Sequence, residues 1–159
     1  MPTKAFLDAL PRAVLRAAVA ALIVAIVPLQ PQAQTRDIIL FADASLKNAI
    51  DEANILFLSD NAMNVVVTYG ATPELARQLE NGAMADVFIS AGPALMSALA
   101  ERKLIEPDTR ADLVRKAPTV YPVAILTNST NVLASIYVQY LISGKAAPFF
   151  EKQGFVFLP

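Results

Sequence analysis

The chain of 159 residues contains no cysteine and no histidine. These two absences exclude disulfides, zinc sites built from Cys or His ligands, cysteine nucleophiles, and catalytic pairs in which a histidine activates a serine or cysteine. Among the hydroxyl, lysine and carboxylate side chains that remain, no spacing pairs a nucleophile with a base. The sequence therefore predicts that the protein is not an enzyme.

Charge is also scarce, because only 17% of the residues are charged and the formal net charge is -1. Without a basic excess the chain has nothing to attract a phosphate backbone, so nucleic acid is not an expected partner. Hydrophobic residues make up 55% of the sequence, which is enough to build a core. Length and composition together predict one folded domain.

The first 33 residues differ from the rest of the chain. Three basic residues, Lys4, Arg12 and Arg16, precede an uncharged run from Ala17 to Leu29. A helix that spans a bilayer needs roughly 20 apolar residues, whereas a basic stretch followed by a shorter apolar run is typical of a secretory signal. We therefore expect residues 1–33 to be a signal peptide. An uncleaved anchor is the alternative, because Pro31 stands where a small residue normally precedes the cut.

From Asp37 onward, short apolar runs alternate with helical patterns. Strands are predicted at 38–42, 65–69 and 87–90, and helical spacing follows each of them from Leu46 to Phe57, at 73–80 and at 93–102. This alternation is typical of βαβ units. It predicts a three-layer α/β fold, in which helices flank both faces of a parallel-rich sheet. Residues 34–159 are expected to form a single lobe.

The second half of the chain is less regular. Residues 106–116 are charged, and residues 120–126 resemble a strand that contains Pro122. Because proline lacks the N–H that a central strand needs, this strand is expected at a sheet edge or as a crossing segment. Helices are predicted at 132–142 and 146–152, and residues 155–158 close the chain.

Two hydroxyl residues stand where predicted strands give way to predicted helices. Ser45 follows the first strand, and Thr72 follows the second, where Pro73 then opens the helix and Gly70 allows a close backbone approach. The carboxyl ends of parallel strands lie along one edge of a sheet. Free N–H groups at helix starts favour an oxyanion, so both positions could bind one. The alternative is that each hydroxyl only caps its helix.

Five blocks of the sequence, in order, resemble the periplasmic molybdate-binding proteins of ABC transporters. They are Phe41-Ala-Asp-Ala-Ser45-Leu-Lys-Asn48, Tyr69-Gly-Ala-Thr-Pro-Glu-Leu-Ala-Arg-Gln78, Asn81-Gly-Ala-Met-Ala-Asp-Val-Phe-Ile-Ser-Ala91, Tyr121-Pro-Val-Ala-Ile125 and Phe149-Phe-Glu-Lys-Gln-Gly-Phe155. The resemblance runs from about Asp37 to Pro159. It implies one lobe of a periplasmic-binding-protein fold, a periplasmic location, and a membrane permease as partner.

The resemblance also implies the ligand residues. Ser45, Thr72 and Tyr121 match the positions that bind molybdate or tungstate, and backbone groups at Ala44 and Ala71 are expected to contribute with those of Ser45 and Thr72. These groups bind the oxygens of the oxyanion, so no direct metal ligand and no cofactor is implied.

The sequence departs from the family in two ways. Asp43 stands where the family usually has Ala or Ser, and a carboxylate so close to the site would repel an anion if it faced inward. Residues 34–116 and 117–159 correspond to the outgoing and returning parts of one lobe, with most of the second lobe absent between them. Only one side of the ligand-binding cleft would then be present, and we expect the oxyanion to bind weakly.

Three functions follow from these observations. The first is delivery of molybdate or tungstate to a permease, and the second is binding of another small oxyanion such as sulfate. The third is a truncated, vestigial or interaction protein that binds no ligand and self-associates through its exposed crevice. Lys47 and Arg77 are expected to be solvated, Asp86 to be structural, and the C-terminal phenylalanines to belong to the core.

Overall fold

The computed structural model describes residues 36–159, so the expected signal peptide lies outside the described residues. Described strands are β1 (Ile38–Asp43), β2 (Val65–Gly70), β3 (Val87–Ile89), β4 (Ala111–Lys116), β5 (Thr119–Ile125) and β6 (Val156–Phe157). Helices are α2 (Lys47–Asn61), α3 (Thr72–Glu80), α4 (Pro93–Glu101), α5 (Leu133–Leu141) and α6 (Ala147–Glu151), with short 3-10 helices η1 (Ala44–Leu46) and η2 (Pro107–Thr109). None of these described helices has the length and hydropathy needed to cross a bilayer.

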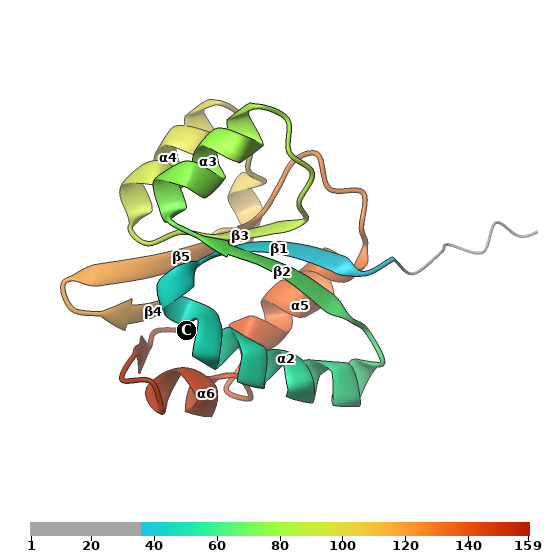
Figure 1. Cartoon of the computed structure of the whole chain (residues 1–159), viewed down its shortest axis with the longest axis vertical. Helices are drawn as coiled ribbons and strands as arrows, with labels where there is room; N and C mark the ends of the chain where they lie inside the picture. The colour runs from blue at the N-terminus through green and yellow to red at the C-terminus, as the bar shows by residue number, and fades with distance from the viewer. Residues whose placement is uncertain (1–35) are drawn as a thin grey trace, which may run out of the picture. The chain divides into compact units, whose positions relative to one another are not determined.

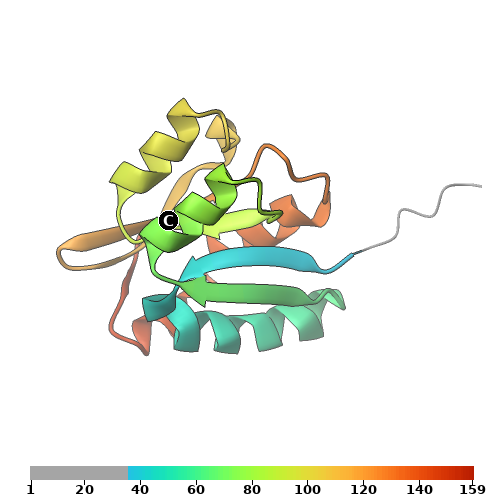
Figure 2. The ribbon, with the colours of Figure 1, turned by 45° about the horizontal axis from the view of Figure 1, so that its top comes forward.

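The six strands form one mixed sheet in the order β2-β1-β3-β5-β4-β6. The strands β2, β1 and β3 run parallel, whereas β5 is antiparallel to both β3 and β4, and β6 is antiparallel to β4. In Figure 2 the arrowheads of β1 and β2 lie at the same end of the sheet. The predicted α/β fold is confirmed, and its parallel pairings are confined to one half of the sheet.

Helices cover both faces of the sheet and make a three-layer structure (Figure 1). The helices α3 and α4 pack on one face, and α2, α5 and α6 lie on the other. Because successive side chains of a strand point to opposite faces, β1 contributes to both cores. Leu40 and Ala42 belong to the core beneath α2 and α5, whereas Phe41 belongs to the core beneath α3 and α4.

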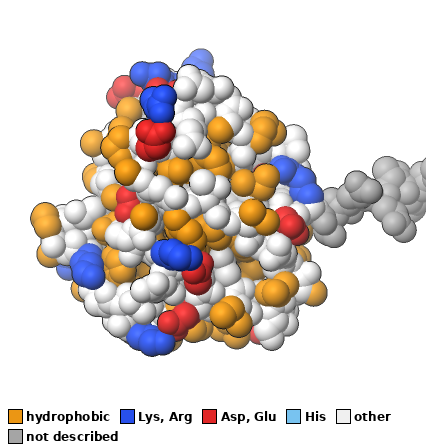
Figure 3. Space-filling model, in the orientation of Figure 1, with side chains coloured by type: hydrophobic (Ala, Val, Ile, Leu, Met, Phe, Trp, Pro, Cys, Tyr) orange, Lys and Arg blue, Asp and Glu red, His pale blue; other side chains and the backbone are white. Residues whose placement is uncertain are grey.

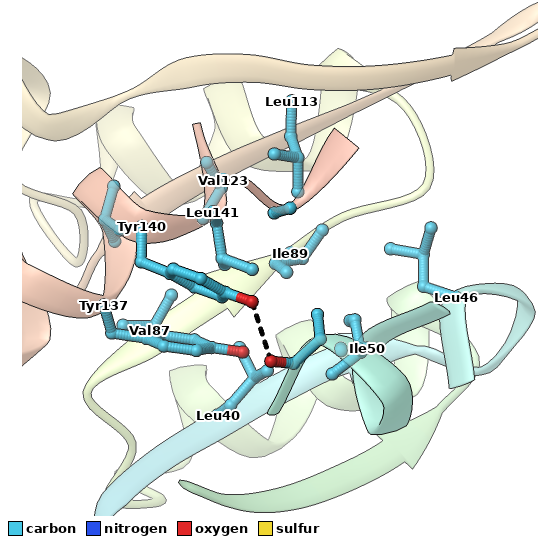
Figure 4. Close-up of a cluster of buried hydrophobic side chains, with 14 of the residues drawn as sticks. Leu40, Leu46, Ile50, Val87, Ile89, Leu113, Val123, Tyr137, Tyr140 and Leu141 are labelled. Carbon is cyan, nitrogen blue, oxygen red and sulfur yellow. Dashed lines mark hydrogen bonds between the residues drawn. The ribbon is translucent and has the colours of Figure 1, made fainter. Parts of the chain in front are cut away.

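Two tyrosines of α5 give the larger core its polar contacts. The hydroxyl of Tyr140 donates a hydrogen bond of 2.8 Å to the carbonyl of Ala53, which is the bond drawn in Figure 4. The hydroxyl of Tyr137 donates to Asn54 Oδ1 over 2.7 Å. Buried hydroxyls need such partners, so these bonds fix how α5 lies against α2.

The expected edge position of the Pro122 strand is wrong, because β5 lies inside the sheet between β3 and β4. The carbonyl of Pro122 accepts a hydrogen bond from Ser90 N over 3.1 Å. In antiparallel pairs the N–H and C=O of one residue face the same neighbour, so the missing donor lies opposite Ser90. That residue comes just after the end of β3, where only one ladder bond is lost.

Residues 106–116 form more structure than their charge suggests. They contain η2 and all of β4, whose Leu113 and Val114 are buried. The register of β4 against β5 shifts between Asp112 and Val114, so a bulge interrupts the simple alternation of side chains. Only Ala117 and Pro118 separate β4 from β5.

Candidate functional site

Four strand ends meet at one rim of the sheet. Asp43 ends β1 and pairs in register with Gly70, which ends β2, so the segments that follow these two strands start side by side. The end of β3 lies beside β1. Because β5 runs antiparallel to β3, its first residues return to this same rim and bring Tyr121 there. Four segments distant in sequence therefore supply polar groups to one place.

The centre of the rim is the carboxylate of Asp43. Its Oδ1 accepts hydrogen bonds from the N–H of Ser45 over 3.0 Å and from Ser45 Oγ over 2.7 Å. Its Oδ2 accepts from the N–H of Thr72 over 3.3 Å and from Thr72 Oγ1 over 2.7 Å. The two predicted ligand loops thus aim four donors at one anionic group, and Asp43 faces inward, the orientation that the sequence left open.

Tyr121 completes the contacts at the rim. Its hydroxyl lies 3.2 Å from Ser45 Oγ. A serine hydroxyl has one hydrogen, and the shorter bond gives it to Asp43, so Tyr121 is the donor to Ser45. Tyr121 is 7% exposed, and its ring meets the Phe155 ring edge-on with centroids 5.4 Å apart. The structure therefore brings Ser45, Thr72 and Tyr121 together.

A further backbone donor at this rim was missed by the sequence analysis. The N–H of Ala91, just beyond the end of β3, donates to Thr72 Oγ1 over 2.8 Å. The Thr72 side chain is therefore held between a donor on one side and the Asp43 carboxylate on the other, with 2% of the residue exposed. The block from Asn81 to Ala91 was singled out in the sequence, but nothing in it indicated this contact.

Neither hydroxyl residue caps a helix, so that alternative is wrong. Asp43 is the N-cap of η1, and Thr72 is already the first residue of α3 behind an N-cap at Ala71 that has no side-chain bond. Ala44 and Ala71 are exposed beside the carboxylate, and the N–H groups that reach it are those of Ser45 and Thr72. The glycine before Ala71 leaves room for α3, since a Cβ on Gly70 would lie 3.1 Å from Leu75 Cδ2.

Basic side chains near the rim are paired with acids on their own helices. Lys47 Nζ lies 2.7 Å from Asp51 and 4.7 Å from the Tyr69 ring centroid, and Arg77 pairs with Glu74. More than half of each basic side chain is exposed, which confirms that both are solvated. The face seen in Figure 3 likewise shows basic and acidic side chains beside one another. The donors that reach Asp43 are instead neutral hydroxyl and N–H groups of Ser45 and Thr72.

The Asp43 contacts predict a specific pH dependence of stability. Burial raises the pKa of the Asp43 carboxyl, but hydrogen bonds from the side chains and N–H groups of Ser45 and Thr72 outweigh it and hold that pKa below the ordinary 3.8. A depressed folded-state pKa stabilises the fold above pH 3.8, and this contribution disappears as pH falls through the lower value. Substitution Asp43→Asn should therefore lower the free energy of unfolding at pH 7 by about 1–2 kcal/mol, with solvent screening included.

Urea titrations of both proteins between pH 7 and pH 3 check this expectation. The difference in free energy of unfolding between the original protein and the Asp43→Asn variant should become smaller below pH 4. A difference that stays constant across this range would show that the Asp43 charge has no role in these bonds.

Comparisons with known proteins identify relatives for different shares of the chain. The model of a family described as bacterial extracellular solute-binding protein matches residues 38–118. The molybdate-binding protein ModA of Escherichia coli K12 is 39% identical over 77 residues, which are 48% of this chain and 30% of that protein. ModA of Haemophilus influenzae is 29% identical over 111 residues, which are 69% of this chain and 44% of that protein. The chain thus spans less than half the length of these curated relatives.

Solved structures share the fold. A substrate-binding domain of a putative molybdenum ABC transporter from Clostridium difficile aligns with a TM-score of 0.72 at 18% identity, over 77% of this chain and 99% of that one. The periplasmic molybdate-binding protein of Azotobacter vinelandii aligns with a TM-score of 0.71 at 10% identity, over 77% of this chain and 100% of that one. At such identities these matches show the α/β binding-protein fold and nothing finer.

Proposed function

Because the chain belongs to the family of bacterial extracellular solute-binding proteins, we propose that it holds a small tetrahedral oxyanion, molybdate or tungstate, at the rim. Ser45, Thr72 and Tyr121 are the ligand residues in this proposal. After export, the protein presents the oxyanion to an ABC transporter permease in the inner membrane. The family is one of solute-binding proteins and not of enzymes, in keeping with the absence of histidine and cysteine from the chain.

The observation that carries the proposal is the convergence of the Ser45 and Thr72 donors on the Asp43 carboxylate. A carboxylate and a tetrahedral oxyanion both present negatively charged oxygens that accept several hydrogen bonds. Donors arranged for one are therefore suited to the other, with Tyr121 as a further donor.

The choice of molybdate rests on the relatives, of which those at 39% identity are named as molybdate-binding proteins. Neutral hydroxyl and amide donors favour an oxyanion whose oxygens are all deprotonated, because every ligand oxygen then acts as an acceptor. Sulfate satisfies the same requirement and is the competing ligand to test.

The arrangement of the lobe predicts that binding is weak. Residues 34–116 and 117–159 make one lobe in this proposal, and the two-residue connection from β4 to β5 leaves no second lobe at the point where the relatives' chain would cross into it. Ser45 is exposed at the rim, so water reaches the ligand and screens its hydrogen bonds. Two or three missing charge-assisted bonds, each worth about 1.5–3 kcal/mol, would raise the dissociation constant by several powers of ten.

Calorimetric titration of molybdate, tungstate and sulfate into the purified chain tests the proposal. Substitution Thr72→Val keeps the shape of the side chain but removes its hydroxyl, and should weaken molybdate binding at least tenfold. Substitution Thr72→Ser keeps the hydroxyl and is the matched control, with binding within about threefold of the original. Equal affinities of the valine and serine variants would place the ligand elsewhere.

A non-binding protein is the second candidate, because Asp43 already satisfies the donors that a ligand would need. It predicts no heat of binding with any of the three oxyanions. Gel filtration with and without molybdate then shows whether two copies associate, as a vestigial or interaction role through the exposed crevice would require.

A further inference from the structure

The Asp43 carboxylate and a bound oxyanion require the same hydrogens. Ser45 Oγ and Thr72 Oγ1 each have one hydrogen, and the 2.7 Å bonds give both of them to Asp43. The N–H groups of the same two residues also point to Asp43. An oxyanion that takes these donors must therefore displace the carboxylate.

We propose that Asp43 is an internal anionic ligand that competes for the oxyanion site and weakens the binding of doubly charged oxyanions more than that of singly charged ones. The proposal rests on the function proposed above, because it assumes that the rim takes oxyanions at all. It assigns to Asp43 a role in specificity in addition to its role as the N-cap of η1.

Charge discrimination follows from the surroundings of Asp43. All four of its hydrogen-bond donors are neutral, so no adjacent cation offsets its charge within these contacts. The nearby Lys47 is paired with Asp51 and leaves that part of α2 without excess positive charge. Repulsion between Asp43 and a ligand is proportional to the ligand charge, so a dianion is opposed about twice as strongly as a monoanion.

Displacement of Asp43 is sterically open. Asp43 is only partly buried, and its neighbour Ala44 is exposed, so the carboxylate can turn from the rim into water. Water then solvates the released carboxylate, but the charge stays near the ligand and continues to repel it. Alanine at this position removes both the competition for donors and the repulsion, whereas asparagine removes the repulsion but keeps an acceptor oxygen.

Two tetrahedral ions that differ in charge test the proposal. Molybdate carries two negative charges at neutral pH and perrhenate carries one, and each is titrated calorimetrically into the full chain and its variants. Substitution Asp43→Ala should tighten molybdate binding at least tenfold, about 1.4 kcal/mol, and tighten perrhenate binding less. Substitution Asp108→Ala removes the same charge from an exposed residue of η2 and should leave both affinities unchanged.

Asp43→Asn guards against loss of folding in the alanine variant, because its amide keeps an oxygen for the Ser45 donors. The ratio of molybdate to perrhenate affinity should rise in this variant as well. If the unsubstituted protein binds molybdate and neither substitution raises that ratio, Asp43 does not compete and the inference is overturned, while the proposed function stands. If no variant binds either ion at millimolar concentration, the proposed function itself fails and the inference with it.

Discussion

Substitution of Asp86 by alanine is expected to lower the free energy of unfolding by about 3–5 kcal/mol. The carboxylate is completely buried directly before β3 and accepts four hydrogen bonds. Two are short, at 2.6 Å from Arg36 and from Ser129 Oγ, and the others come from Ile39 N at 2.9 Å and Asn131 Nδ2 at 3.3 Å. Alanine would leave these donors without the acceptor that they share at a fully buried position.

The loss should affect several segments at once, because the donors belong to the chain before β1, to β1 itself and to the loop that precedes α5. Urea unfolding at pH 7 measures it, with Asp108→Ala as the control for removal of one exposed carboxylate. That control should change stability by less than about 0.5 kcal/mol. Equal destabilisation by the two substitutions would contradict a structural role for Asp86.

Asp86 also shows what a single sequence can predict about a buried charge. Its position before an apolar strand indicated a structural role, and the ion pair with Arg36 confirms it. The partners Ser129 and Asn131 are more than 40 residues away in the chain. No local pattern connects them to Asp86, so their contribution could be found only from the tertiary structure.

The fold was predictable where hydrophobic periodicity was strong. The positions Leu46, Ile50, Ala53 and Phe57 recur at helical spacing, and all four are buried, Leu46 at the end of η1 and the other three on α2. The strand β4 was missed because its bulge breaks the alternation that identifies a strand and because charged residues surround Leu113. The inner position of β5 was missed because the rule that excludes proline from central strands assumes that both neighbouring strands extend past the proline. Here β3 ends before it reaches Pro122.

The sequence predicted which residues meet at the site, but not that the Asp43 carboxylate lies among them. The rule that parallel strands end at one edge placed Ser45 and Thr72 together, and the resemblance to the family added Tyr121. Whether Asp43 turned toward or away from these residues depended on its rotamer and on donors from η1 and α3. Two of these donors belong to Ser45 in its own segment and two to Thr72 on the neighbouring helix, so the segment alone did not decide the inward orientation.

The second large effect is expected at Phe57, where alanine should lower the free energy of unfolding by about 3–5 kcal/mol. Phe57 is fully buried, and its ring centroid lies 5.0 Å from that of Tyr137 and 5.1 Å from that of Tyr140. Removal of the ring leaves a cavity between α2 and α5. Tyr137 and Tyr140 each lose a packing contact on the side that faces Phe57. Their hydrogen bonds to Asn54 and Ala53 would then lose the packing that orients them.

Leu58→Ala is the matched control, since Leu58 is the next residue of α2 and is 48% exposed. It should cost less than about 1 kcal/mol, because a half-exposed side chain leaves no closed cavity. Thermal and urea unfolding of the two variants give the comparison. The helix α2 begins directly after the rim, so a Phe57→Ala protein that remains folded should also hold η1 and Ser45 less firmly. Similar losses from the two substitutions would mean that the contact between α2 and α5 does not support the lobe.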